Sequence, residues 1–201
     1  MTRILLARHG ETDWNREGRW QGHMDTPLNE AGRRQARALA AHLAGEGVDA
    51  LYSSDLARAR QTAEVVEAAT GLEAIIDADL REVDVGEWAG CNRAEARARD
   101  PEWYQEWLTG AVTGYRGGET YLQLHERSVR AFQRVLAAQD GRTAVIVCHG
   151  GNIRAIVSDV VGLGPDQRWR VASVANCSLT TIERLHGRIT LATFNESGYV
   201  V

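Results

Sequence analysis

Two histidines occupy similar places in the chain, each after a short apolar run and directly before a glycine. His9 follows RILLA and Arg8, and His149 follows TAVIVC. A neutral imidazole can act as a nucleophile or carry a proton near pH 7. The planar fork of an arginine such as Arg8 or Arg58 can hold two phosphate oxygens at once. Either histidine segment alone could be a surface turn, but the pair indicates a functional site for an anionic group.

The sequence around these residues is typical of an α/β fold. We expect buried strands at residues 3–7, 50–54 and 143–149, a strand followed by a loop within 72–80, and a hairpin turning at His186-Gly187. We expect helices from a cap at Asn29 to about Leu43, from a cap at Asp55 to about Ala69, from about Glu119 to Ala138, and after His149 to about Val161. Strands that alternate with helices predict a three-layer α/β/α sandwich with a mainly parallel sheet. His9 and His149 would then lie beyond the carboxyl ends of two strands, where such sheets bind ligands.

Residues 92–116 interrupt this alternation, and we expect them to form a helical lid inserted into a single domain of residues 1–201. Asp100-Pro101 is a typical helix start, because proline suits the first helical position. Trp103, Tyr104 and Trp107 follow at helical spacing. Aromatic residues in this arrangement usually pack in a core, but several in one insertion can also form an apolar wall against a ligand. We expect this segment to decide specificity.

Composition excludes several classes of protein. All 23 basic residues are arginine, and without lysine the chain cannot be a P-loop NTPase, a Schiff-base aldolase or a pyridoxal phosphate enzyme. A formal net charge of -4 argues against a nucleic acid partner. The three widely spaced cysteines favour reduced thiols. The charged N-terminal segment predicts neither a signal peptide nor a membrane span, so we expect a cytoplasmic protein with no membrane partner.

Four segments together carry a resemblance to a known family. They are ARHGETDWN (7–15), SSDLARARQTA (53–63), LREVDVGEWAG (80–90) and VCHGG (147–151). With DTPLNEAGRRQA (25–36) and GGET (117–120), they resemble the histidine phosphatase superfamily, which has the phosphoglycerate mutase-like fold. The match runs from the first predicted strand to the last, and the combination is highly specific.

This resemblance implies a role for each matching residue. His9 would become phosphohistidine, Arg8 and Arg58 would clamp the phosphate, and His149 would bond the transferring oxygens. Glu82 would be the general acid that protonates the leaving group and then the base for water, and we expect a mildly acidic pH optimum. The implied phosphate and substrate contacts also include Asn15, Gln21, Gly22, Gly150 and, from the residues alone, Arg116 before a helix start. No metal and no cofactor are expected, because the arginines and His149 supply the positive charge.

The sequence is compatible with three functions. The favoured one is a phosphomonoesterase that acts on a small-molecule phosphate monoester. The second is a cofactor-dependent phosphoglycerate mutase, although the segment VGEWAGCNRAEAR lacks the lysine and paired arginines expected after the acid residue. The third is a catalytically idle binding protein on the same fold. His42, His125 and His186 are expected to be structural or solvated, and the role of His23, the natural substrate and the oligomeric state, including a homodimer, stay open.

Overall fold

The computed structural model describes residues 1–200, and a six-stranded sheet forms their centre. The strands are β1 (Thr2–Arg8), β2 (Ala50–Ser53), β3 (Ala74–Ile76), β4 (Thr143–Cys148), β5 (Leu179–Leu185) and β6 (Arg188–Glu196). Their order is β3-β2-β4-β1-β5-β6. The pairs among β1 to β4 are parallel, whereas β5 and β6 add as an antiparallel hairpin at one edge. The predicted mainly parallel sheet is confirmed.

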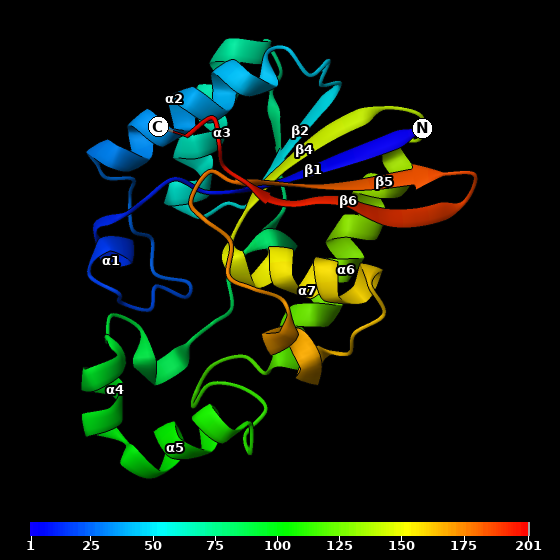
Figure 1. The fold of residues 1–201 in the computed structure, drawn as a ribbon. Coiled ribbons are helices and arrows are strands. Elements are labelled where there is room, and N and C mark those ends of the chain that lie inside the picture. Colours follow the sequence, from blue (N-terminus) through cyan, green and yellow to red (C-terminus); the bar gives the residue numbers. More distant parts are fainter. Residues whose placement is uncertain (201) are drawn as a thin grey trace.

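Helices cover both faces of this sheet (Figure 1). The α-helices are α1 (Asp13–Arg16), α2 (Glu30–Leu43), α3 (Ala57–Thr70), α4 (Arg93–Arg99), α5 (Pro101–Thr109), α6 (Tyr121–Ala138) and α7 (Gly150–Val160). Three short 3-10 helices are η1 (Ala78–Leu80), η2 (Gly86–Trp88) and η3 (Pro165–Arg170). The helices α2 and α3 lie on one face, and α6 and α7 lie on the other (Figure 1). No helix among residues 1–200 is both long and apolar enough to cross a bilayer.

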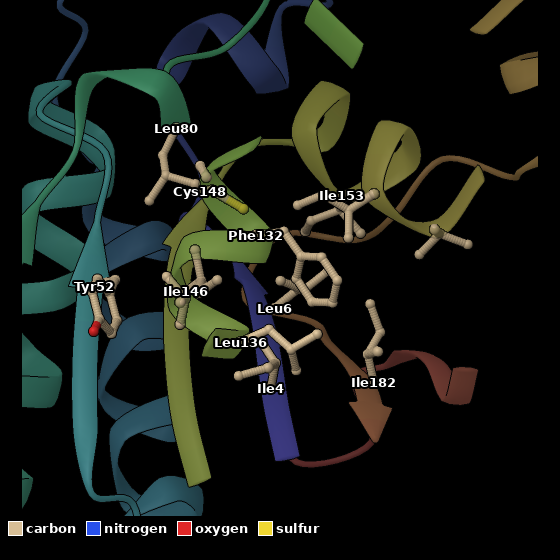
Figure 2. Close-up of a cluster of buried hydrophobic side chains, with 14 of the residues drawn as sticks. Ile4, Leu6, Tyr52, Leu80, Phe132, Leu136, Ile146, Cys148, Ile153 and Ile182 are labelled. Carbon is tan, nitrogen blue, oxygen red and sulfur yellow. The ribbon is translucent and has the colours of Figure 1, made fainter. Parts of the chain in front are cut away.

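The central strands are apolar throughout because both of their faces are buried. In β1, Ile4 and Leu6 join the core under α6 and α7, whereas Leu5 and Ala7 join the core under α2 and α3. Figure 2 shows the first core, where Phe132 of α6 packs near Leu6. Burial of each large aliphatic side chain contributes about 1.5–3 kcal/mol. These two cores fix the strands whose ends carry the site.

The helix starts show which caps the sequence predicts well. Asn29 caps α2, and its side chain accepts a hydrogen bond from the backbone N–H of Gly32 at 2.8 Å. The predicted cap at Asp55 is wrong, because α3 begins at Ala57 after Leu56 and has no side-chain cap. Arg81 instead binds the Asp55 carboxylate through Nε at 2.9 Å. This ion pair joins segments 26 residues apart, which local spacing does not reveal.

Residues 92–116 hold α4 and α5, which lie apart from the sheet in Figure 1. Asp100 caps α5 by accepting from the N–H of Trp103, and Gly110 ends the helix in the left-handed conformation. An aromatic cluster joins this segment to the loop that follows β3. Its members are Trp20, Trp88, Trp103, Tyr104, Trp107 and Tyr115. Trp88 is only 1% exposed at its centre, so this segment has a small apolar core of its own.

Candidate active site

The two histidines are brought together by neighbouring parallel strands. β1 and β4 pair in a register that sets Arg8 opposite Cys148, so His9 and His149 follow at the same edge of the sheet. The N–H of His9 donates to the carbonyl of Cys148 at 3.0 Å. The centroids of the two imidazole rings are 5.1 Å apart. Both side chains are almost fully buried, at 2% exposure for His9 and 0% for His149.

His9 is held in one tautomer by its own loop. Nδ1 lies 2.7 Å from the carbonyl oxygen of Gly10, and a carbonyl only accepts, so Nδ1 carries the proton. The Nε2 lone pair is therefore free. Burial, followed by the charges of Arg58 and Arg8, holds the pKa of His9 well below its ordinary value of 6.5. His9 is a neutral imidazole with an available lone pair at neutral pH.

His149 is neutral for similar reasons. Burial is the largest cause that holds its pKa well below 6.5, and the charge of Arg58 is the next. Its Nε2 lies 3.0 Å from Oγ of Ser54, and its Nδ1 is buried without a partner. Ser54 belongs to the segment that the sequence singled out, but its contact with His149 was not predicted. This contact crosses 95 residues of chain.

Arg8 and Arg58 are anchored by backbone carbonyls rather than by carboxylates. Arg8 donates from a terminal nitrogen to the carbonyl of Val174 at 2.6 Å. Arg58 donates from its two terminal nitrogens to the carbonyls of Gly22 and Met24, each at 2.8 Å. The Nε atoms of both arginines are buried without a partner. Burial lowers the pKa of Arg8, and it lowers the pKa of Arg58 to about 10, which leaves Arg58 charged at neutral pH.

Positive charge exceeds negative charge around His9, because in the described chain Glu82 is the one acidic side chain that lines the cavity with Arg8 and Arg58. Among residues 1–200, no carboxylate forms a salt bridge within 4.0 Å of Arg8 or Arg58. The charge of Glu82 raises the pKa of both arginines, but one carboxylate cannot neutralise two buried cations, and a bound anion would lower the cost of burying them. Arg8, Arg58 and His149 each have a buried nitrogen without a partner, and all three residues act on His9 through their charge or ring contact. The site is therefore built to receive an oxyanion beside Nε2 of His9.

Glu82 reaches the same cavity from the loop before η2. Its Oε1 accepts from the N–H of Gly151 at 3.1 Å and from its own neighbour Val83 at 2.9 Å. A Cβ on Gly151 would lie 2.1 Å from Oε1 of Glu82, so only glycine allows this approach. Two side chains hold the backbone of Glu82 in place, because Nε2 of His23 and a terminal nitrogen of Arg127 each lie 2.8 Å from its carbonyl oxygen. The carboxylate thus sits at the N-terminus of α7, next to Gly150.

The other predicted phosphate contacts are partly brought together. Asn15, Gln21, Gly22 and Gly150 all line the cavity that contains Arg8, His9, Arg58 and Glu82. Asn15 closes a capping box with Thr12, and Oε1 of Gln21 accepts from the hydroxyl of Thr12 at 3.0 Å. Arg116 lies elsewhere. Its exposed side chain binds Asp100 and faces the ring of Trp103, which holds it outside the cavity wall.

Several cavity residues were missed by the sequence analysis. The cavity has a volume of about 290 Å³. Part of its wall, which we call the far end, is formed by Tyr121 and His125 of α6, Arg154 of α7 and Arg168 of η3. The lining residues not predicted include Tyr121, Arg154, Arg168, Ser173 and Val174. His125, expected to be structural or solvated, also lies on this wall. No local motif marks these positions, because they meet only when the helices pack.

Some of the aromatic residues in the segment 92–116 line the cavity and others do not. Trp107 and Tyr115 line the cavity, as does Trp20. Trp103 and Tyr104 do not line it and pack in the aromatic cluster instead. The insertion is thus both a small core and one side of the cavity. Among residues 1–200, no group of three His, Cys, Asp or Glu side chains is placed to hold a metal ion.

Comparisons with known protein sequences cover most of the chain. The profile of the histidine phosphatase superfamily (branch 1) matches residues 4–197. Phosphoglycerate mutase-like protein 4 of Arabidopsis thaliana is 41% identical over 76% of this chain and 68% of that protein. The probable phosphoglycerate mutase GpmB of Escherichia fergusonii is 34% identical over 91% of this chain and 85% of that protein. The chain spans only about half, 55%, of bifunctional protein Rv2228c of Mycobacterium tuberculosis, at 33% identity.

Solved structures of similar proteins have the same fold as this chain. Bacillus stearothermophilus YhfR superposes with a TM-score of 0.93 at 30% identity, covering 100% of both chains. A mycobacterial glucosyl-3-phosphoglycerate phosphatase, solved with VO3, superposes with a TM-score of 0.89 at 32% identity, covering 97% of this chain and 99% of the other. Both similarities extend over the whole sheet and its helices.

Proposed function

Because the chain belongs to branch 1 of the histidine phosphatase superfamily, we propose that it hydrolyses small phosphate monoesters through a covalent intermediate on His9. The observation that carries this proposal is the free Nε2 of a neutral His9 beside two arginines that have no carboxylate partner. The similarity to a phosphatase over 97% of the chain supports it.

In the first step, Nε2 of His9 attacks phosphorus, and the bond between phosphorus and the ester oxygen breaks. Arg8, Arg58 and Nδ1 of His149 stabilise the charge on the three phosphoryl oxygens during this in-line transfer. Glu82 gives its proton to the departing oxygen, so the alcohol leaves as a neutral molecule. The products of this step are phosphohistidine at position 9, the alcohol and the carboxylate of Glu82.

In the second step, water attacks the phosphohistidine. Glu82 takes a proton from the water, the bond between Nε2 and phosphorus breaks, and inorganic phosphate leaves. Asn15 and the N–H of Gly150 serve as neutral donors to the phosphoryl oxygens. The guanidinium groups supply the positive charge that a metal ion supplies in other phosphoryl-transfer enzymes, so the proposed reaction is independent of metal.

The first test is hydrolysis of p-nitrophenyl phosphate in excess EDTA. We expect steady release of phosphate by the unaltered protein and a loss of at least about a thousandfold in His9→Ala, because the nucleophile is removed. His186→Ala is the matched control, since His186 lies in the exposed turn between β5 and β6. Turnover that needs added magnesium, or that survives in His9→Ala, would contradict the proposal.

A mutase is the second candidate, since two relatives carry that name and the cavity contains two further arginines, Arg154 and Arg168. A mutase must keep its phosphohistidine from water and return the phosphate to a second hydroxyl. Isomerisation of 3-phosphoglycerate, stimulated by the corresponding bisphosphate and faster than phosphate release, would favour the mutase. Phosphate release without isomerisation would favour the phosphatase.

A further inference from the structure

The far end of the cavity contains two arginines that the proposed chemistry does not use. Arg154 lies on α7 and Arg168 on η3, and both line the same cavity as His9. Arg154 donates from Nε to the carbonyl of Val171 at 3.0 Å and from a terminal nitrogen to the carbonyl of Arg168 at 2.8 Å. These bonds fix the guanidinium of Arg154 and join it to the backbone of η3.

Neither of these arginines has an acidic partner. In the described part of the chain, no carboxylate makes a salt bridge with Arg154 or Arg168. Arg19, which also lines the cavity, differs because it is bound by both Glu17 and Glu95. Burial lowers the pKa of Arg154 and Arg168, and the charge of Arg168 lowers the pKa of Arg154 further. The two charges repel each other in a partly buried wall, which an anion between them would relieve.

The surrounding groups at this end are mainly neutral. Arg168 lies over the ring of Tyr121. The Nδ1 atom of His125 is buried without a partner. The Nε2 atom of His125 lies 3.5 Å from Oδ1 of Asp159. Ser173 adds a hydroxyl to the cavity lining. The charge of Glu82 raises the pKa of Arg154 and that of Asp166 raises the pKa of Arg168, but neither carboxylate forms a salt bridge with these arginines.

The two ends belong to one small space. A volume of about 290 Å³ lies near the lower end of the range for small-ligand sites. Glu82 accepts from the N–H of Gly151, and Arg154 follows three residues later on the same helix, so α7 borders both ends of the cavity. One small ligand can reach both.

We propose that Arg154 and Arg168 bind a second anionic group of the substrate, so that the protein prefers phosphate monoesters carrying a carboxylate or another phosphate. This inference rests on the proposed function, in which the phosphoryl group binds beside His9. The phosphoryl group to be transferred lies beside His9, and the second anion lies between the two arginines. Charge-assisted hydrogen bonds to such an anion are expected to favour it by roughly tenfold or more over a neutral group of the same size.

The test measures binding of three series of stable phosphonates by titration calorimetry. Each series has two to six methylene groups after the phosphonate, and the chain ends in a methyl group, a carboxylate or a second phosphonate. We expect one spacer length at which an anionic end binds at least about tenfold tighter than the methyl end. The series that gives this preference identifies the second anion as a carboxylate or a phosphate.

Variants assign the preference to the two arginines. In Arg168→Met and in Arg154→Met the ratio of the two dissociation constants is expected to fall toward one, and Arg168→Lys should keep part of it. Arg170→Met is the matched control, because Arg170 lies on the same short helix but does not line the cavity. Arg168 is the more direct test, since Arg154 also supports the backbone of η3.

A preference of less than about twofold at every spacer length would overturn this inference, as would a preference that survives in Arg168→Met. The binding experiment needs no turnover. It therefore separates this inference from the proposed phosphatase activity, whose failure would appear as an absence of phosphate release from p-nitrophenyl phosphate.

Discussion

Two buried histidines and two arginines that lack acidic partners define the centre of the site. Burial alone would lower the pKa of His9 and His149, and Arg58 lowers both further. A neutral imidazole has a lone pair that can attack phosphorus, which is the role proposed for His9. A neutral His149 can also lie near two cations without charge repulsion. The same burial has a consequence for stability, because the unfolded chain holds these imidazoles in water.

The pH dependence of stability follows from this difference. The pKa of both histidines is about 6.5 in the unfolded chain and well below it in the folded protein. Between those values the unfolded chain binds more protons, so the free energy of unfolding is expected to fall as pH drops below about 6.5. Each histidine contributes a slope of up to about 1.4 kcal/mol per pH unit. Urea unfolding at a series of pH values from 8 to 5 measures it.

Two variants separate the contribution of His149 to this pH dependence from the contribution of Asp and Glu side chains, which also titrate at low pH. His149→Gln is expected to reduce the slope of the free energy of unfolding against pH, between pH 6.5 and 5, by up to about 1.4 kcal/mol per pH unit. This change in slope is expected even if the variant is less stable overall. His186→Gln, in an exposed turn, should leave the slope as it is. An unchanged slope in His149→Gln would show that His149 is not held neutral in the folded protein.

Residue types were easier to predict than their local contacts. The positions of Arg8, His9, Arg58 and His149 at strand and helix ends follow from the apolar runs and glycines around them. The protonated Nδ1 of His9 does not, because it depends on the orientation of the Gly10 carbonyl. The catalytic roles of these residues stay predictions.

The N-terminus of α7 is the element that positions Glu82. Its first residues are Gly150 and Gly151, which line the cavity and whose N–H groups have no partner within the helix. Glu82 accepts from the N–H of Gly151, and this approach leaves no room for a Cβ. A carboxylate at this helix end is also favoured by the helix dipole. The second glycine of the CHGG motif is therefore explained by contact with Glu82.

Gly151→Ala is expected to displace the Glu82 carboxylate and to lower kcat by roughly 100-fold, since misplacement by about 1 Å has effects of that size. Gly150→Ala is the matched control with a much smaller expected loss. A Cβ there would lie 3.9 Å from Nε of Arg8 and 4.0 Å from Glu82, which are ordinary contacts. Circular dichroism would check the fold of both variants. Equal losses in the two variants would contradict this role of Gly151.

Elements with a strong local pattern were predicted well, and those fixed by distant contacts were not. The strands β1 and β4 and the cap of α2 follow from apolar runs and Asn29. The start of α3 does not, because Asp55 binds Arg81 from another segment. The placement of Arg116 similarly depends on Asp100, which a helix-start argument cannot foresee.

At the scale of the whole molecule, the sheet collects residues from distant parts of the chain at one edge. The loop after η3 shows this, since Asn176 donates to the carbonyl of His9 at 2.9 Å across 167 residues. The carbonyl of Val174 likewise anchors Arg8. Such contacts depend on the packing of α7 and η3 and have no local signature. The fold class was predictable from periodicity, whereas the far wall of the cavity was not.

The central claim is that phosphate passes through a bond to Nε2 of His9. Rapid acid-free quenching of the protein with a ³²P-labelled monoester, followed by digestion and mass spectrometry, locates the transient label. We predict an acid-labile, base-stable phosphoryl group on the peptide that contains His9, formed before steady-state turnover and absent in His9→Ala. Label on any other residue, or brisk hydrolysis with no trapped label, would contradict this account.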